Sequence, residues 1–314
     1  MIQPDYAKWN RPVFPYDGVE AFLRSPNFVS GVHTVNCDGL PVDLLFHRKN
    51  ADTLLVVFGA AAPRSAATSP PFFSGLGLAS DLRCSTLCVN DPSYYLDEGI
   101  RIAWYVGSKR VLLQPILPAI FDAVATRSNC RRIIFTGGSA GGFACLYYVL
   151  KTAFPAMAFA FNPQTNISKY DPAHLKLFAR VCFDWQEGQE VEASYASLID
   201  YDVVRLYQSP PRPPVLYLQN KPDWHIKVHA APFLQTYGVE WTGQDQVGED
   251  RLYLHVGHWG DGHIPPPKTV VQECLKFLCD WRGSWQGALT SPALGEVVVR
   301  ARDASTRDNA SPRT

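Results

Sequence analysis

A single serine lies among four glycines at the junction of two apolar segments. The stretch RRIIFTGGSAGGFACLYYVL, residues 131–150, places Gly137-Gly138-Ser139-Ala140-Gly141 between a strand-like run and a helix-compatible run. This G-x-S-x-G context is typical of a nucleophile elbow, a turn so sharp that it exposes the serine hydroxyl and leaves no room for neighbouring β-carbons. The dipole of the helix that follows would stabilise negative charge developing on a substrate oxygen. The sequence therefore predicts Ser139 as a catalytic nucleophile.

A phosphate-binding loop or an ordinary tight connection is the competing interpretation of these glycines. The segment lacks the lysine of a P-loop, and GGSAGG does not follow the pattern G-x-G-x-x-G. The position between a strand and a helix favours the elbow.

A serine hydroxyl needs a base to take its proton and a carboxylate to orient that base. In chains with this elbow the partners follow in the order serine, acid, histidine, each on a loop beyond the carboxyl end of a strand. Asp223 follows the strand-like run PVLYLQN, residues 214–220, and is the preferred acid. His263 lies in a Gly-Asp-Gly-His turn after RLYLHVG, residues 251–257, and this position gives it the reach that a base needs.

Alternatives stay open for both partners. His258 lies in the same last loop, almost against the strand, and is the second candidate base. Weaker candidate acids are Asp261, Asp184 and Asp171. Without a catalytic role, Asp223 would cap a helix and His263 would shape a turn.

An oxyanion hole would use backbone N–H groups. The amide of Ala140, directly after the nucleophile, is the first expected donor. The second would follow the run TLLVVF, where Gly59 and Ala60 are the candidates.

These residues must be positioned by strands and helices that alternate along the chain. Short apolar runs predict strands, and segments with apolar residues at helical spacing predict helices. The predicted strands are 42–48, 53–59, 85–91, 130–138, 156–162, 214–220 and 251–257. The predicted helices are 117–127, 143–154 and 270–281. Such alternation indicates an α/β fold with a mainly parallel sheet covered by helices on both faces.

One domain accounts for most of the chain. We expect it to span residues 1–286 and to carry an inserted cap or lid at about 163–213, where the alternation is interrupted and the run SPPRPP follows. Residues 287–314 lose their apolar periodicity and end in RDASTRDNASPRT, so we expect a disordered tail.

Composition excludes several classes of protein. The formal net charge is zero and basic residues do not cluster, which argues against nucleic acid as a partner. No apolar run approaches the roughly 18 residues of a membrane span, and the N-terminus does not follow the pattern of a signal peptide. Eight scattered cysteines without a CxxC pair predict free buried thiols and a cytoplasmic location. The oligomeric state is left open.

At the residues described above, the sequence resembles the α/β-hydrolase superfamily of serine esterases and acyltransferases, over about residues 42–281. It departs from the hormone-sensitive-lipase branch, which carries an HGGG-type motif where FGAAAPR stands here. The combination of FGAAAPR, NDPSYYLDEGIRIAWYVG, GGSAGGFACLYY and FNPQTNISKY resembles bacterial proteins similar to the accessory secretion-system glycan O-acetyltransferases. This resemblance implies acyl transfer to, or deacylation of, an ester such as an acylated sugar or glycan.

The same resemblance suggests residues that would contact such a substrate. Asn162, Gln164 and Tyr170 would line the site, or would simply begin the cap. Trp104, Trp224 and Trp259 would stack on sugar rings, although packing in the core is the commoner role of tryptophan.

Two other functional classes compete with a serine hydrolase or acyltransferase. A metal-dependent hydrolase would use His225 and His229, spaced i, i+4, or the neighbouring His255, His258 and His263. The HExxH glutamate is missing, so we expect neither a metal nor another cofactor. A non-catalytic α/β-hydrolase-like binding protein is the third class, and a complete candidate triad argues against it.

Overall fold

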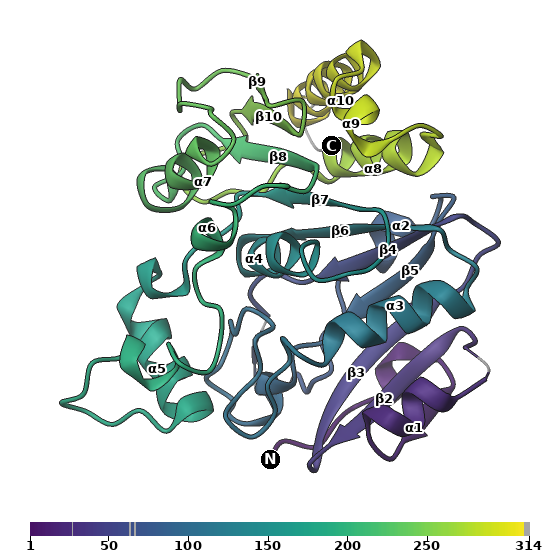
Figure 1. The fold of residues 1–314 in the computed structure, drawn as a ribbon, viewed down its shortest axis with the longest axis vertical. Coiled ribbons are helices and arrows are strands. Elements are labelled where there is room, and N and C mark those ends of the chain that lie inside the picture. The colour runs from purple at the N-terminus through teal and green to yellow at the C-terminus, as the bar shows by residue number, and fades with distance from the viewer. Residues whose placement is uncertain (27, 63, 66, 311–314) are drawn as a thin grey trace.

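The structure is a computed structural model that describes residues 1–310 except 27, 63 and 66, with side chains described up to Ala301. Within that part of the chain, ten strands form one sheet (Figure 1). The strands are β1 Val13–Tyr16, β2 Gly31–Cys37, β3 Leu40–His47, β4 Thr53–Phe58, β5 Ser85–Val89, β6 Arg132–Gly138, β7 Ala156–Phe161, β8 Val215–Asn220, β9 Gln246–Gly248 and β10 Leu252–Gly257.

The strand order is β1-β2-β3-β5-β4-β6-β7-β8-β10-β9. Neighbours from β5 to β10 pair in parallel, whereas β3 runs antiparallel to β2 and β5, and β9 runs antiparallel to β10. The chain passes from β4 to β5 on one side and later returns to β6 on the other side of β4. This reversal of strand order is the place where open α/β sheets bind ligands, beyond the carboxyl ends of the strands.

Helices cover both faces of the sheet. They are α1 Val19–Arg24, α2 Leu76–Ala79, α3 Leu117–Arg127, α4 Ser139–Tyr148, α5 Pro172–Phe183, α6 Val203–Leu206, α7 Ala231–Gln235, α8 Lys268–Asp280, α9 Trp285–Leu289 and α10 Pro292–Ala310. Short 3₁₀ turns are η1 Ala7–Trp9, η2 Pro92–Tyr95, η3 Ile167–Lys169 and η4 Glu192–Ser194, and η5 Ile226–Ala230 is a π-helical turn.

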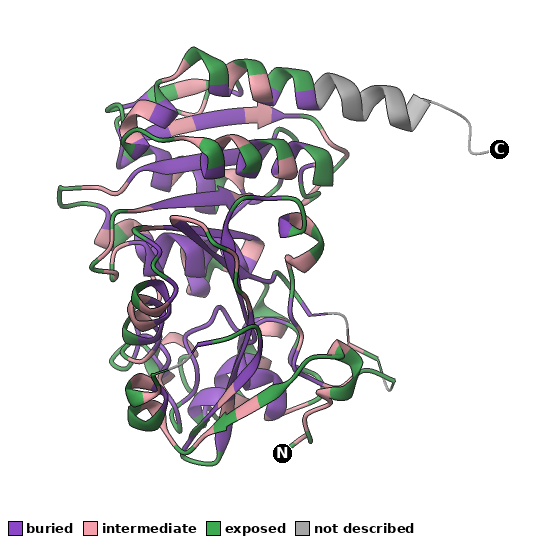
Figure 2. Cartoon of the chain, turned by 90° about the vertical axis from the view of Figure 1, so that its right-hand side faces the viewer, coloured by how far each residue is buried: buried purple, intermediate pink, exposed green. Residues whose placement is uncertain are grey.

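The strands separate two hydrophobic cores because successive side chains of a strand point to opposite faces. In β6, Ile133 and Phe135 pack into the core beneath α3 and α4, whereas Ile134 packs into the core beneath α8 and α10. Figure 2 shows the resulting layers, with buried strands between helices whose outer surfaces are exposed. A continuous run of apolar residues is what a strand buried on both faces requires.

The predicted α/β architecture is confirmed, and all seven predicted strands are present as β3 to β8 and β10. The predicted helix 117–127 has the same bounds as α3. The helix predicted at 143–154 begins four residues earlier, at Ser139, because Gly141 and Gly142 lie inside α4 rather than in the turn. Helix α8 begins at Lys268, two residues before the predicted start.

The prediction of a disordered tail from residue 287 is wrong for the part that the structure describes. Helices α9 and α10 occupy this stretch, and α10 buries Leu294, Val298 and Ala301 in the core beneath α8. These three residues follow at spacings of four and three, so they lie on one helix face. Residues 311–314, which the prediction also covers, lie outside the described residues.

The segment between β7 and β8 contains η3, α5, η4 and α6. Its aromatic residues surround Trp104, whose ring centroid lies 5.0 Å from that of Phe178 and 5.6 Å from that of Tyr170. Whether this insertion acts as a cap stays a prediction.

All eight cysteines lie in the described part of the chain, where they are buried and free of disulfide bonds. Among the described residues, none of the helices combines the length and the apolar character needed to cross a bilayer.

Candidate active site

Ser139 occupies a strained turn between β6 and α4. Its φ is +52°, in the left-handed region that residues with a β-carbon rarely adopt. A β-carbon on Gly141 would lie 2.5 Å from the carbonyl oxygen of Phe58, and one on Gly137 would lie 2.5 Å from that of Gly141. The glycines therefore allow α4 to begin directly against the end of β4, and the predicted elbow geometry is present.

The hydroxyl of Ser139 receives a hydrogen bond from a buried amide. Gln164 Nε2 donates to Ser139 Oγ over 3.1 Å. The other end of the same amide accepts a hydrogen bond from Trp104 Nε1, so the orientation of Gln164 is fixed from both sides. Gln164 is fully buried, and its backbone N–H donates to the carbonyl oxygen of Ser139 over 3.0 Å. Of the predicted substrate-contacting residues, Gln164 is the one that the structure brings to the serine.

Asp223 and His263 form the second half of the site. His263 Nδ1 lies 2.7 Å from Asp223 Oδ2, although the two residues come from the loops after β8 and β10. Burial alone would raise the pKa of Asp223, but hydrogen bonds from His263 and from the backbone N–H of His225 outweigh burial and lower it. The carboxylate is therefore ionised, and it also accepts a hydrogen bond from Gln219 Nε2.

The structure does not join the two halves by a direct hydrogen bond. In the described part of the chain, Ser139 Oγ bonds to Gln164 and not to His263. Because Nδ1 of His263 faces Asp223, the other ring nitrogen, Nε2, is the one that would receive a proton from a nucleophile.

A second histidine lies at the same carboxylate. His225 Nδ1 is 2.9 Å from His263 Nδ1 and 3.6 Å from Asp223 Oδ1. Burial, reinforced by the neighbouring His263, lowers the pKa of His225 to about 4, so this ring is neutral at pH 7. Burial likewise lowers the pKa of His229, in the π-helical turn, to about 3. Asp223, His225 and His263 bring three potential ligand atoms within 4.8 Å of one another.

Two buried asparagines hold the loop that carries His263. Asn220, the last residue of β8, donates to the carbonyl oxygens of Gly260 and Gly262, over 2.8 Å each. Asn162, directly after β7, donates to the carbonyl oxygen of Ile264 over 2.7 Å and accepts a bond from the Asn220 backbone N–H. The position of His263 is therefore set by the carboxyl ends of two strands that pair with each other.

The expected oxyanion donors lie close to the elbow. A β-carbon on Gly141 would lie 2.6 Å from the carbonyl oxygen of Gly59, so the backbone after β4 contacts the first turn of α4. Ala140 is buried in that first turn, and Ala60 is exposed. The assignment of Ala140 with Gly59 or Ala60 as N–H donors stays a prediction.

Two of the other predicted contact residues, Trp224 and Tyr170, lie beside His225. Trp224 is 59% exposed, with its ring centroid 3.7 Å from that of His225 and 6.0 Å from that of His263. The ring of Tyr170 lies 5.8 Å from that of His225. Trp259 instead packs, partly buried, against the core beneath α8, beside Gly257, and its role in stacking on a sugar stays a prediction. His258, the alternative base, is exposed and lies 4.0 Å from Asp261 rather than beside Asp223.

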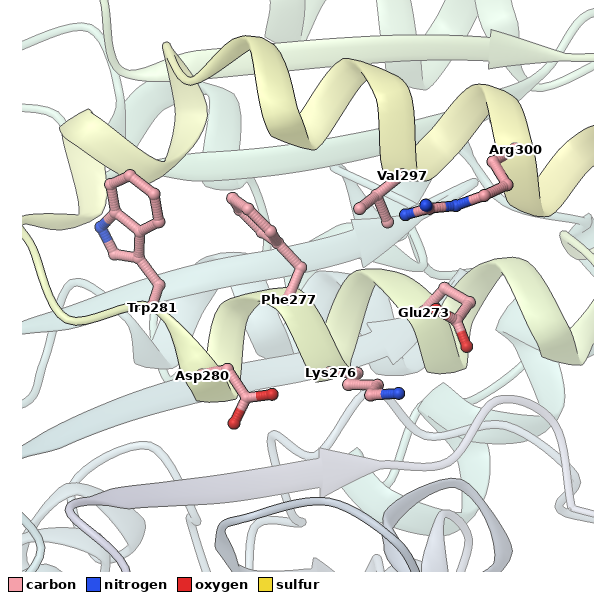
Figure 3. Close-up of a pocket in the computed structure, with 7 residues that line it drawn as sticks. All are labelled: Glu273, Lys276, Phe277, Asp280, Trp281, Val297 and Arg300. Atoms are coloured by element: carbon pink, nitrogen blue, oxygen red, sulfur yellow. The ribbon is translucent and has the colours of Figure 1, made fainter.

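A cavity of about 380 Å³ lies away from these residues, between α8 and α10 (Figure 3). Figure 3 shows Phe277 and Val297 facing each other across it. Its lining consists of Glu273, Lys276, Phe277, Asp280, Trp281, Val297 and Arg300. None of the candidate catalytic residues lies on these two helices, so the candidate active site is the one at the carboxyl ends of the strands.

Sequence reasoning missed two contributions to the site. The i, i+4 spacing of His225 and His229 suggests only a pair of metal ligands, whereas the structure places His225 against Asp223 and His263. Its position two residues after the candidate acid was the available signal. Asn220 gave no signal, because an asparagine at the end of a strand is common and its partners lie about 40 residues away.

No protein-family model matches the chain, and none of the curated proteins matches its sequence. Solved structures match its fold. The capsule O-acetyltransferase of Neisseria meningitidis serogroup A is 14% identical, with a TM-score of 0.55 over 92% of this chain and 99% of that one. An S-formylglutathione hydrolase from Agrobacterium tumefaciens is 14% identical, with a TM-score of 0.51 over 82% and 95% of the two chains.

A third match is a puromycin-hydrolysing peptidase from Mycobacterium tuberculosis. It is 16% identical, with a TM-score of 0.52 over 83% of this chain and 40% of that one. At such identities the likeness shows the fold and not the substrate. With a mainly parallel sheet flanked by helices and a serine at the turn after β6, this chain has the α/β-hydrolase fold.

Proposed function

We propose that this protein is a serine-dependent acyl hydrolase or acyltransferase that works through an acyl-enzyme. The observation that carries the proposal is the pairing of a strained, half-buried Ser139 with an Asp223–His263 hydrogen bond on the loops after β8 and β10. These loops follow the nucleophile in the order that this fold uses for acid and base.

In this mechanism Ser139 Oγ attacks the ester carbonyl while His263 Nε2 takes the hydroxyl proton. The ionised Asp223 stabilises the imidazolium and keeps Nδ1 protonated. The tetrahedral oxyanion is bound by backbone N–H groups at Ala140 and at Gly59 or Ala60. His263 then gives its proton to the departing alcohol, which leaves an acyl group on the serine. Water or a second alcohol releases that group, with His263 again acting as base.

The substrate class to test first is an acylated sugar or glycan. The exposed face of Trp224 beside the two histidines offers an apolar surface on which a sugar ring could stack. The sequence resemblance to glycan O-acetyltransferase-like proteins and the fold shared with a capsule O-acetyltransferase support the same class. Short-chain nitrophenyl esters and acetylated sugars, assayed with and without an acceptor sugar, separate hydrolysis from transfer.

A fluorophosphonate probe tests the nucleophile directly. The wild type should be labelled and should hydrolyse nitrophenyl acetate, and Ser139→Ala should lose both. Asp223→Asn should lower kcat on the order of 10⁴-fold while the protein stays folded, because the histidine loses its orienting partner. Retained labelling in Ser139→Ala, or retained turnover in His263→Ala together with loss in His258→Ala, would contradict the assignment.

A further inference from the structure

The cluster of Asp223, His225 and His263 contains more metal-ligating atoms than a catalytic triad needs. A triad uses one carboxylate and one imidazole, and here a second imidazole lies against both. His263 Nδ1 lies 2.7 Å from Asp223 Oδ2 and 2.9 Å from His225 Nδ1, and one ligand atom of each residue lies within 4.8 Å of the other two. Around a tetrahedral Zn²⁺ with bonds of about 2.0–2.1 Å, ligand atoms are about 3.3 Å apart. The two distances from His263 Nδ1 would have to lengthen by about 0.5 Å for the three groups to hold one ion.

The hydrogen bond between His263 and Asp223 leaves His225 Nδ1 with a free lone pair that faces His263. His263 Nδ1 carries the hydrogen that it donates to Asp223, so His225 Nδ1, 2.9 Å away, must be an acceptor. The proton of the neutral His225 is therefore on Nε2, and this atom is buried without a hydrogen-bond partner in the described part of the structure. An imidazole oriented in this way is not explained by hydrogen bonding alone.

We propose that Asp223, His225 and His263 form an inhibitory site for a divalent transition metal of the zinc class. Two imidazoles and one carboxylate suit Zn²⁺ and its first-row neighbours better than Mg²⁺ or Ca²⁺, which prefer oxygen ligands. The ion would reach the cluster past Trp224, beside the His263 side chain, which is 22% exposed.

Inhibition follows from the tautomer that the metal selects. Coordination uses the lone pair of His263 Nδ1, so the proton leaves Nδ1 and, through solvent, Nε2 takes one up. The ring stays neutral overall, but Nε2 then carries a hydrogen and cannot accept the proton of Ser139. The binding itself does not depend on the proposed function, whereas the inhibition rests on it.

The missing hydrogen-bond partner of His225 Nε2 in the described structure determines the metal affinity that we expect. Metal-bound histidines usually donate their second ring N–H to a partner, and loss of such a partner costs about 10–100-fold in affinity. His225 Nε2 has none among the described residues. We therefore expect reversible binding that a chelator removes, not a permanently held ion.

Calorimetric titration of the metal-free protein with Zn²⁺ tests the site. The wild type should bind one ion per chain, and nitrophenyl ester hydrolysis should fall with the same midpoint and return on addition of chelator. His225→Gln should bind zinc at least about tenfold more weakly, and whatever ester hydrolysis this variant retains should not fall at zinc concentrations that inhibit the wild type. The matched control is His174→Asn, which removes an exposed histidine 3.0 Å from Asp171 and should behave as the wild type.

A second measurement keeps the test valid if His225→Gln does not fold. The zinc K-edge absorption spectrum of the wild-type complex should show nitrogen and oxygen ligands and no sulfur. Sulfur ligation, equal affinity in folded His225→Gln, or activation by zinc would overturn the proposal. Zinc binding without any esterase activity would refute the proposed function and leave the metal site standing, and esterase activity without zinc binding would do the reverse.

Discussion

Gln164 makes the hydrogen bond that holds the hydroxyl of Ser139, the proposed nucleophile. Its amide donates to Ser139 Oγ and accepts from the buried Trp104 indole, so the two neighbours share one side chain. A donor at one lone pair of Oγ leaves the hydroxyl hydrogen free for the base and the second lone pair free for attack. The amide is therefore a positioning group for the hydroxyl and not a proton acceptor.

Replacing this amide should affect stability and reactivity separately. Gln164→Leu leaves the buried indole N–H without an acceptor, which costs about 1–3 kcal/mol of unfolding free energy. Gln164→Glu keeps an acceptor for Trp104 and should recover part of that loss, while the rate of fluorophosphonate labelling should fall in both variants. Urea unfolding and labelling kinetics measure the two effects. Equal stability of wild type and Gln164→Leu would contradict the role assigned to this bond.

His33 gives a pH-dependent test in a part of the molecule away from the site. Its ring stacks on Phe28 at a centroid distance of 4.0 Å, donates from Nε2 to the carbonyl oxygen of Val29, and accepts from the Tyr16 hydroxyl. Burial lowers its pKa to about 4. In the unfolded chain its pKa is about 6.5. Between about pH 6.5 and pH 4 the unfolded chain therefore binds more protons than the folded one, and His33 lowers the free energy of unfolding as the pH falls through this range.

The expected measurement is a comparison of His33→Gln with the wild type by urea unfolding. The wild type should be the more stable protein at pH 7.5. Its advantage should shrink by about 2 kcal/mol by pH 5, because only the wild type carries this histidine. A difference that is the same at both pH values would show that His33 is not held neutral.

At the scale of residues, the sequence predicted the candidate catalytic residues that the structure brings to one edge of the sheet, but not their surroundings. A glycine-flanked serine constrains the local backbone so strongly that Ser139 could be identified from a few residues. Asp223 and His263 could be chosen because loops after strands meet at one edge of a parallel sheet. The bond between Gln164 and Ser139 depends instead on a non-local approach of the loop after β7, which no local pattern encodes.

At the scale of elements, the loop after β10 is held by hydrogen bonds from the end of the neighbouring strand, β8. Asn220 donates to two carbonyl oxygens of this loop and accepts from the backbone N–H of Trp259 over 2.9 Å. Three hydrogen bonds from one buried side chain fix a segment that contains two glycines with positive φ, Gly260 and Gly262. Without them the turn would have little to hold one conformation.

Asn220→Asp should therefore lower turnover although the substitution is nearly isosteric. The carboxylate keeps the acceptor for Trp259 but faces the carbonyl oxygens of Gly260 and Gly262 without a donor. We expect kcat for ester hydrolysis to fall at least about tenfold while KM changes little, because His263 is displaced and the substrate surface is not. Steady-state kinetics measure this split. A change confined to KM would mean that Asn220 acts on substrate binding.

Elements were predictable where the pattern was local and repeated. The central strands are continuous apolar runs, and α3 shows apolar residues at helical spacing. β1, β2 and β9 were not predicted. β1 and β9 are short, and the pattern of β2 is interrupted by His33 and other polar residues. The helical character of residues 292–301 was missed because its buried residues are few and surrounded by charged and small ones.

At the scale of the whole molecule, α10 contributes to the core beneath α8, and none of the proposed catalytic residues lies on this helix. Leu294 is fully buried in that core, while Val299 on the same helix is 41% exposed. Leu294→Ala should reduce the free energy of unfolding by about 2–5 kcal/mol, because it leaves a cavity between packed helices. Val299→Ala, the matched control, should change it by less than about 0.5 kcal/mol.

Thermal or urea unfolding measures this difference, and ester hydrolysis at a temperature where both variants are folded should remain close to that of the wild type. A Leu294→Ala protein that is folded but inactive would show that the core beneath α8 also determines the geometry at the ends of the strands.

The register of β10 against β8 has a consequence for synthesis. During translation the hydroxyl of Ser139 leaves the ribosome long before the imidazole of His263, and β10 can pair with β8 only after both strands have emerged. An incomplete nascent chain would thus carry the proposed nucleophile without the proposed base. Under the proposed function, acyl chemistry would begin only when the C-terminal part of the sheet has been added, so premature termination would release inactive fragments.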